Sequence, residues 1–174
     1  CTVYPKKYHW EMWKHFKSID IQASIDDTGN RYEYNRYPAK WDIAKENLIK
    51  LRNNALIYDN VQLSISTTVS VFTVFYLDEF FDFITENKLP TPWLGRLQDP
   101  YYYRVNVLPD KIRELAQQKL FNSSYSDLQK IAIWLDDDES EHWEKFLEIT
   151  NMQDRYRKES FSDTFSELFE LIDK

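Results

Sequence analysis

Two stretches of the chain alternate strictly between apolar and hydrogen-bonding residues, and a helical stretch separates them. In residues 19–26, isoleucine or alanine alternates with polar residues, and residues 61–70 repeat this pattern. A period of two predicts a β-strand, whereas the spacing of apolar residues over residues 41–53 predicts a helix. Connections that contain a helix usually join parallel strands. The sequence therefore predicts an α/β fold in which the two strands are adjacent and parallel.

Further elements continue this order along the chain. Residues 75–87 predict a helix, because four apolar side chains recur at the i, i+3, i+4 and i+7 positions of one face. A third strand is predicted over residues 102–107. Pro109 begins the helix after it, since proline fits the first turn of a helix. Beyond residue 120 the apolar spacing is helical throughout. The other predicted helices are residues 7–16, 124–135, 138–156 and 162–172.

The second predicted strand carries a row of small polar side chains. Parallel sheets normally have both faces covered, and ordinary (β/α)8 barrels fill their interior with Val, Ile and Leu. A polar ligand inside an open, partial barrel would account for the polar face. An antiparallel sheet with one wet face gives the same alternation without any ligand. The side chains in question are Gln62, Ser64, Ser66, Thr68 and Ser70.

Composition excludes several classes of function. The net charge of −7 disfavours nucleic-acid binding, which needs a clustered basic surface. No run of about 18 apolar residues is present to span a membrane. The single cysteine cannot form an internal disulfide, so we expect a reducing cytoplasm. The three histidines include no pair at i, i+4, and we expect no metal site.

The end of the first strand gathers side chains that suit a zwitterion. Ser24 and Asp26 share its polar face, and Arg36 follows a loop in which Gly29 can adopt a left-handed conformation. Arginine can form a bidentate pair with an amino acid's carboxylate, while oxygen atoms accept hydrogen bonds from its ammonium. From the residues alone, Ser24 and Asp26 could equally cap the strand, and Arg36 could be a solvated surface cation.

The stretch from Ala23 to Trp41, ASIDDTGNRYEYNRYPAKW, resembles the segment after the fourth strand of radical S-adenosylmethionine (SAM) proteins. The similarity is to the twitch-domain group, which has a shortened SPASM region. Shorter similar stretches follow at residues 68–70, 107–109, 154–157 and 161–165, so the resemblance covers nearly the whole chain. Two departures are Asp27, where the family usually has glycine, and Ser66, where it often has asparagine.

This resemblance implies a fold and a set of cofactor contacts. Residues 1–120 would form the C-terminal half of a partial (β/α) barrel with parallel strands, and residues 121–174 a helical C-terminal extension packed on it. In the family, residues equivalent to Ser24 and Arg36 contact the methionyl group of SAM. Asp26 and Ser66 complete the candidate cofactor-binding set. No catalytic residue is assigned.

The resemblance also implies what the chain would lack. The family cleaves SAM reductively with a 4Fe-4S cluster held by a Cys-x3-Cys-x2-Cys loop, and the radical formed abstracts hydrogen from the substrate. Cys1 is the only cysteine here. We therefore expect a C-terminal fragment that is inactive without an N-terminal barrel half bearing the cluster. SPASM-like relatives often modify peptides, which makes a peptide the candidate substrate. The alternative is a non-enzymatic binding or interaction module built on a degenerate barrel.

A first prediction concerns the cluster. Anaerobic reconstitution of this chain with iron and sulfide should leave no bound cluster, because a four-iron cluster requires three or four cysteine ligands. Iron and sulfide analysis together with absorbance spectra measures this directly. Stoichiometric iron with charge-transfer absorbance would contradict it and assign Cys1 a role as ligand.

Overall fold

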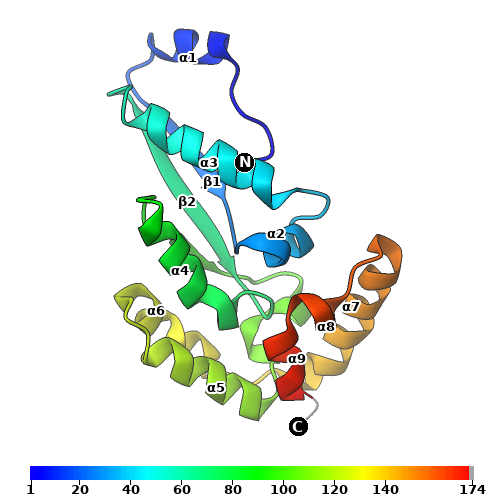
Figure 1. The fold of residues 1–174 in the computed structure, drawn as a ribbon. Helices are drawn as coiled ribbons and strands as arrows, with labels where there is room; N and C mark the ends of the chain where they lie inside the picture. The colour runs from blue at the N-terminus through cyan, green and yellow to red at the C-terminus, as the bar shows by residue number, and fades with distance from the viewer. Residues whose placement is uncertain (173–174) are drawn as a thin grey trace. The chain divides into compact units, whose positions relative to one another are not determined.

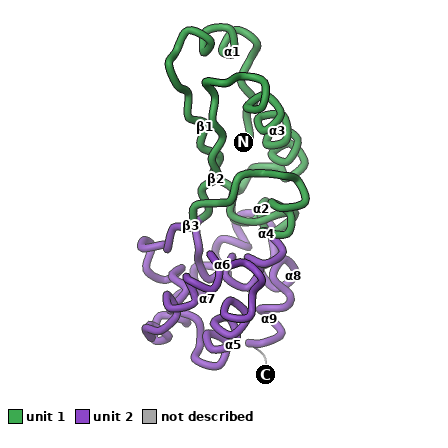
Figure 2. The backbone as a smooth tube through the Cα atoms, turned by 90° about the vertical axis from the view of Figure 1, so that its left-hand side faces the viewer, with its two compact units in different colours: residues 1–67, 81–94 green, residues 68–80, 95–174 purple. Residues whose placement is uncertain are grey.

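The computed structural model describes residues 1–172. The chain groups into two compact units (Figure 2). Unit 1 contains residues 1–67 and 81–94, and unit 2 contains residues 68–80 together with the chain from Gly95 onward. Each unit thus combines two separate stretches of sequence. None of the helices in the described part of the chain has the length and apolarity needed to cross a membrane.

Within residues 1–172, three strands form one small sheet in the order β1-β2-β3. β1 pairs with β2 in parallel, with Ile19 opposite Val61 and Ser24 opposite Ser66. The helices α2 and α3 lie in the connection between them. The predicted mixed α/β fold and the predicted parallel pair are confirmed. The bounds are β1 Ile19–Ser24, β2 Val61–Val69, β3 Trp93–Arg96, α2 Gly29–Asn35 and α3 Trp41–Ala55.

α3 covers the paired strands through an apolar face, and Figure 1 shows it alongside β1 and β2. Its buried residues recur every three to four positions, the spacing that places them on one side of a helix. Leu51 packs in a cluster with Val61 of β2 and Trp10 of α1 (Lys7–Trp13), so the start of β2 is anchored to two helices. The buried residues of α3 are Ala44, Asn47, Leu48 and Leu51.

Unit 2 is held together by an aromatic core. The ring of Phe72 lies 5.4 Å from that of Phe146, 6.0 Å from that of Phe161 and 5.5 Å from that of Phe165 between centroids. Two of these rings, those of Phe161 and Phe165, come from the C-terminal part of the chain. The helices of this part of the chain are α4 Leu77–Glu86, which continues into unit 1, α5 Asp110–Phe121, α6 Ser126–Ile131, α7 Trp143–Arg157, α8 Phe161–Thr164 and α9 Ser166–Ile172.

The prediction of a third strand over residues 102–107 is wrong. This stretch forms two 3-10 turns, Tyr101–Tyr103 and Val105–Val107, and the third strand is instead β3. Asn106 explains the difference, because its side-chain amide donates to the carbonyls of Trp134 at 2.9 Å and Asp137 at 2.8 Å. These contacts to a distant segment hold the backbone in a turn.

The same core generates a prediction about Tyr103. Burial raises the pKa of its hydroxyl to about 12, whereas an unfolded tyrosine titrates near about 10. The folded state therefore retains this proton to higher pH, and Tyr103 stabilises the fold fully below about pH 10. That stabilisation should be lost as the pH rises towards 12.

Spectrophotometric titration of the tyrosines before and after Tyr103→Phe measures this directly. The difference between the two curves should be one late-titrating hydroxyl, and the stability of the variant should fall less steeply in alkali. A difference curve centred near about pH 10 would show that Tyr103 is solvated.

Candidate functional site

The carboxyl end of β1 is fixed by bonds to β2. The Ile25 N–H donates to the Ser66 carbonyl at 3.0 Å, and the buried Thr67 hydroxyl donates to the Ile25 carbonyl at 2.6 Å. Pairing thus continues one residue beyond the strand proper. The consequence is a rigid position for the residues that follow, Asp26 and Asp27, both of which are buried.

Ser24 and Ser66 lie side by side across this strand pair. They are direct partners in the register, and paired residues of neighbouring strands point to the same face of a sheet. Ser24 is exposed and Ser66 is partly buried. Two of the four residues proposed from the sequence are therefore adjacent, and each offers a hydroxyl that can donate or accept a hydrogen bond.

Asp26 and Arg36, the other two, form an ion pair. Arg36 Nε lies 2.7 Å and Nη2 lies 2.6 Å from the same oxygen, Oδ2 of Asp26. The Asp26 side chain is 10% exposed and that of Arg36 is 32% exposed. The Arg36 backbone N–H also donates to the Tyr32 carbonyl at 2.9 Å, which fixes the position of Arg36 at the end of α2.

This geometry occupies only one edge of the guanidinium. A guanidinium carries five N–H donors, and Asp26 uses those on the Nε side. Within residues 1–172, no hydrogen bond or ion pair engages Arg36 Nη1. The Nη1 edge can therefore bind a second carboxylate. Asp26 acts as a positioning residue that sets the direction of this edge.

Arg36 also lines a pocket of 330 Å³. The other lining residues include Lys40, whose ammonium is 2.6 Å from Glu33 Oε2. Asp26 and Glu33 balance the charges of Arg36 and Lys40, so the pocket offers an anion chiefly the N–H donors on the Nη1 edge of Arg36. The full lining is Thr2, Arg36, Pro38, Ala39, Lys40 and Ile43.

Sequence reasoning missed a second buried ion pair beside the first. Asp27, which is 1% exposed, accepts a hydrogen bond from Arg31 Nε at 2.9 Å on one oxygen and from the Thr28 N–H at 2.7 Å on the other. The i, i+4 spacing of Asp27 and Arg31 is the signal that could have indicated it. Gly29, the first residue of α2, has the left-handed backbone that glycine allows, with φ +57°.

The four proposed residues form two separate pairs. No described contact joins Arg36 to Ser24 or Ser66 within residues 1–172. Across the same residues, no group of three or more His, Cys, Asp or Glu side chains is arranged to hold a metal ion. Cys1 has a free thiol and is partly buried. Its backbone carbonyl accepts a hydrogen bond from the Asn47 side chain at 2.8 Å.

Comparison of the chain with protein-family models, with curated proteins and with solved structures gives no match.

The Asp26–Arg36 pair generates a prediction about stability. A double-mutant cycle with Asp26→Asn and Arg36→Gln should give a coupling energy of about 1–2 kcal/mol, because hydrogen bonds between charged groups are strengthened when one partner is buried. Urea unfolding of the four proteins measures it.

The pair Glu33–Lys40 is the matched control. Its lysine side chain is 67% exposed, so its coupling energy should be at most about 0.5 kcal/mol. Equal coupling energies in the two cycles would mean that Asp26 does not hold Arg36 more firmly than an ordinary surface pair is held.

Proposed function

We propose that this chain forms part of the SAM-binding wall of a twitch-domain radical SAM enzyme. In this proposal β1 and β2 belong to a partial (β/α) barrel, and Arg36 binds the carboxylate of the methionyl group. Ser24 and Ser66 provide hydroxyls near the ammonium, and Asp26 orients Arg36. We place the protein in the cytoplasm, in accordance with its single cysteine.

One observation carries the proposal: Asp26 holds Arg36 by one edge while the other edge remains available. Arginine in this geometry favours a planar anion such as a carboxylate. The location adds support, since barrel enzymes bind their ligands at the carboxyl ends of parallel strands. The open sheet and the parallel β1–β2 pair are compatible with a partial barrel.

The residues fit SAM but do not fit an iron–sulfur cluster. Arginine, serine and aspartate suit the charged methionyl end, whereas a cluster needs several thiolates and the chain has Cys1 alone. When bound to its enzyme, SAM supplies the group from which a radical is generated. The role proposed for this chain is limited to binding and orienting that cofactor, alongside a cluster-bearing barrel half and a peptide substrate.

The second candidate function is a non-enzymatic module that binds free amino acids or other small carboxylates. It relies on the same guanidinium edge and on the pocket beside it. The two candidates differ in selectivity, because a SAM site must also contact the adenosyl group. A site for simple carboxylates needs no contact to an adenosyl group.

The proposal is tested in the enzyme completed by its cluster-bearing barrel half, by calorimetric titration with SAM, methionine and 5′-methylthioadenosine, which lacks the carboxylate. Arg36→Ala should weaken binding of SAM about ten- to a hundredfold, because a charge-assisted bond is worth roughly 1.5–3 kcal/mol. Arg36→Lys should restore affinity only in part, since an ammonium lacks the planar fork. Ser24→Ala should cost less, near about 1 kcal/mol.

Lys17→Ala is a control that removes an exposed cation elsewhere in unit 1. It should leave all three affinities unchanged, and Arg36→Ala should not alter binding of 5′-methylthioadenosine. SAM and methionine binding with equal affinity would favour the carboxylate module. No SAM binding, or unchanged SAM affinity in a folded Arg36→Ala protein, would refute the SAM proposal.

A further inference from the structure

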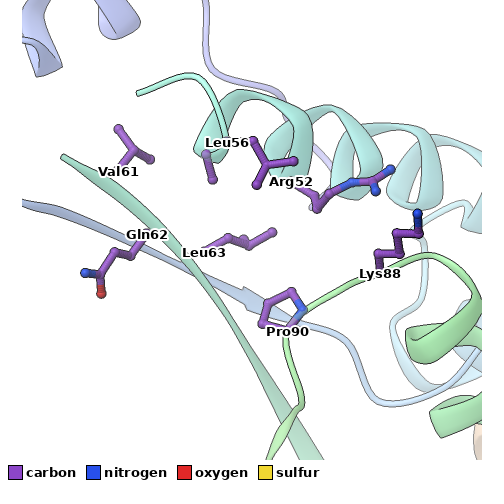
Figure 3. Close-up of a pocket in the computed structure, with 8 residues that line it drawn as sticks. Arg52, Leu56, Val61, Gln62, Leu63, Lys88 and Pro90 are labelled. Atoms are coloured by element: carbon purple, nitrogen blue, oxygen red, sulfur yellow. The ribbon is translucent and has the colours of Figure 1, made fainter. Parts of the chain in front are cut away.

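A groove at the start of β2 combines an apolar wall with two cations. It has a volume of 560 Å³, and its lining residues all belong to unit 1 (Figure 3). The end of α3 and the chain after α4 provide the rest of the wall. Leu56, 77% exposed, leaves a large apolar surface open to solvent. The lining residues are Arg52, Ala55, Leu56, Val61, Gln62, Leu63, Lys88 and Pro90.

Arg52 and Lys88 are not neutralised within the described chain. Neither forms an ion pair or side-chain hydrogen bond with any of residues 1–172, and Arg52 Nε is buried without a hydrogen-bond partner. Figure 3 shows both cationic groups at the same end of the groove. Two like charges at one end of a groove repel each other, and an unpaired buried donor is costly. An anion bound here would relieve the repulsion between the two cations.

Lys88 is held in place by its backbone. Its N–H donates to the Thr85 carbonyl at 3.0 Å, and the N–H of Leu89 donates to the Ile84 carbonyl at 3.0 Å. Lys88 itself has a left-handed backbone, with φ 49°. The backbone that carries this charge is therefore held in a turn just after α4.

The groove follows the backbone edge of β2. Successive residues of a strand point to opposite faces, yet Val61, Gln62 and Leu63 all line the groove. Figure 3 shows Gln62 directed away from Leu63. A groove that runs along the edge of the strand touches all three. The edge in question is the one facing away from β1, since β1 pairs with these residues on the other side.

This edge has no strand partner at the start of β2. β3 is four residues long, and the Leu97 N–H just beyond it donates to the carbonyl of Val69, the last residue of β2. A strand of that length, held there, does not extend back to Val61. Among residues 1–172, no backbone bond from another segment to this edge at Leu63 is found. An unpaired edge is a template for an added strand.

We propose that this groove binds an extended acidic peptide, which adds to the edge of β2 and places a carboxylate against Arg52 and Lys88. Strand addition provides main-chain hydrogen bonds, and alternate side chains of the peptide meet the groove. An apolar residue two positions from the acidic one would cover Leu56. An aliphatic carboxylate would neutralise the two cations and cover the apolar wall, but it would leave the strand edge unpaired.

This site is distinct from the one at Arg36. Val61 and Ser66 are five residues apart along β2, which is roughly 17 Å for an extended chain. The groove lies at the amino ends of the paired strands and the Arg36 pair follows their carboxyl ends. Loss of SAM binding would therefore leave the peptide proposal standing, and the reverse also holds.

The test begins with panning of the full chain against phage-displayed random octapeptides. Enriched peptides should alternate apolar and polar residues and should carry an acidic residue. Fluorescence polarisation with the synthetic, labelled peptide should show about tenfold weaker binding for Arg52→Gln and again for Lys88→Gln. In a series of peptides that are each N-methylated at one position, methylation at every second residue should abolish binding, because those N–H groups bond to the strand edge. Methylation at the residues between them should leave binding unchanged.

The control carries Lys7→Gln and Lys17→Gln, two exposed lysines of unit 1, and changes the net charge equally. It should bind the peptide like the wild type. No enrichment, enrichment without acidic residues, binding insensitive to N-methylation, or wild-type affinity in the Arg52→Gln, Lys88→Gln protein would overturn the proposal.

Two further measurements separate other occupants. Binding of dodecanoate without enrichment of any peptide would make the groove a site for aliphatic carboxylates, and the peptide proposal would be wrong. Sedimentation that shows a concentration-dependent dimer, lost in the Arg52→Gln, Lys88→Gln protein, would assign the edge to a second copy of the chain and would equally overturn it.

Discussion

Parallel pairing of β1 with β2 brings the amino ends of both strands together and their carboxyl ends together, and both proposed sites depend on this pairing. Parallel strands cannot be joined by a tight turn, so the chain must return through a long connection. Here that connection contains α2 and α3. Arg36 directly follows α2, and the last turn of α3 contains Arg52. One topological requirement therefore positions a cation near each end of the strand pair.

The two ends differ in how their charge is balanced. After the carboxyl end, buried carboxylates meet the cations, since Asp26 binds Arg36 and Asp27 binds Arg31. At the amino end, Arg52 and Lys88 meet no described acid. A fixed, partly satisfied arginine suits selective binding of one small carboxylate. An apolar groove with two unsatisfied cations and an open strand edge suits a longer acidic chain.

Burying Asp26 is expensive unless the carboxylate gains strong contacts. Removing a charge from water costs several kcal/mol, so a buried pair often adds little net stability. What such a pair provides is direction: Arg36 is held at Nε and Nη2, and its remaining edge has a defined orientation. We interpret Asp26 as a residue that prepares a binding group, which explains why an acid is buried next to the strand end.

Local patterns in the sequence determined the parts of the fold that depend on backbone periodicity: the strands of residues 19–26 and 61–70, the helix after Trp41 and the left-handed Gly29. Only tertiary structure decided the turn around Asn106, whose partners Trp134 and Asp137 lie about thirty residues away in sequence. The sequence brought Ser24, Asp26, Ser66 and Arg36 forward as candidates. It could not separate them into two pairs, nor place Arg52 beside Lys88. Periodicity is a property of neighbouring residues, whereas charge pairing and grooves arise from side chains that only the folded chain brings together.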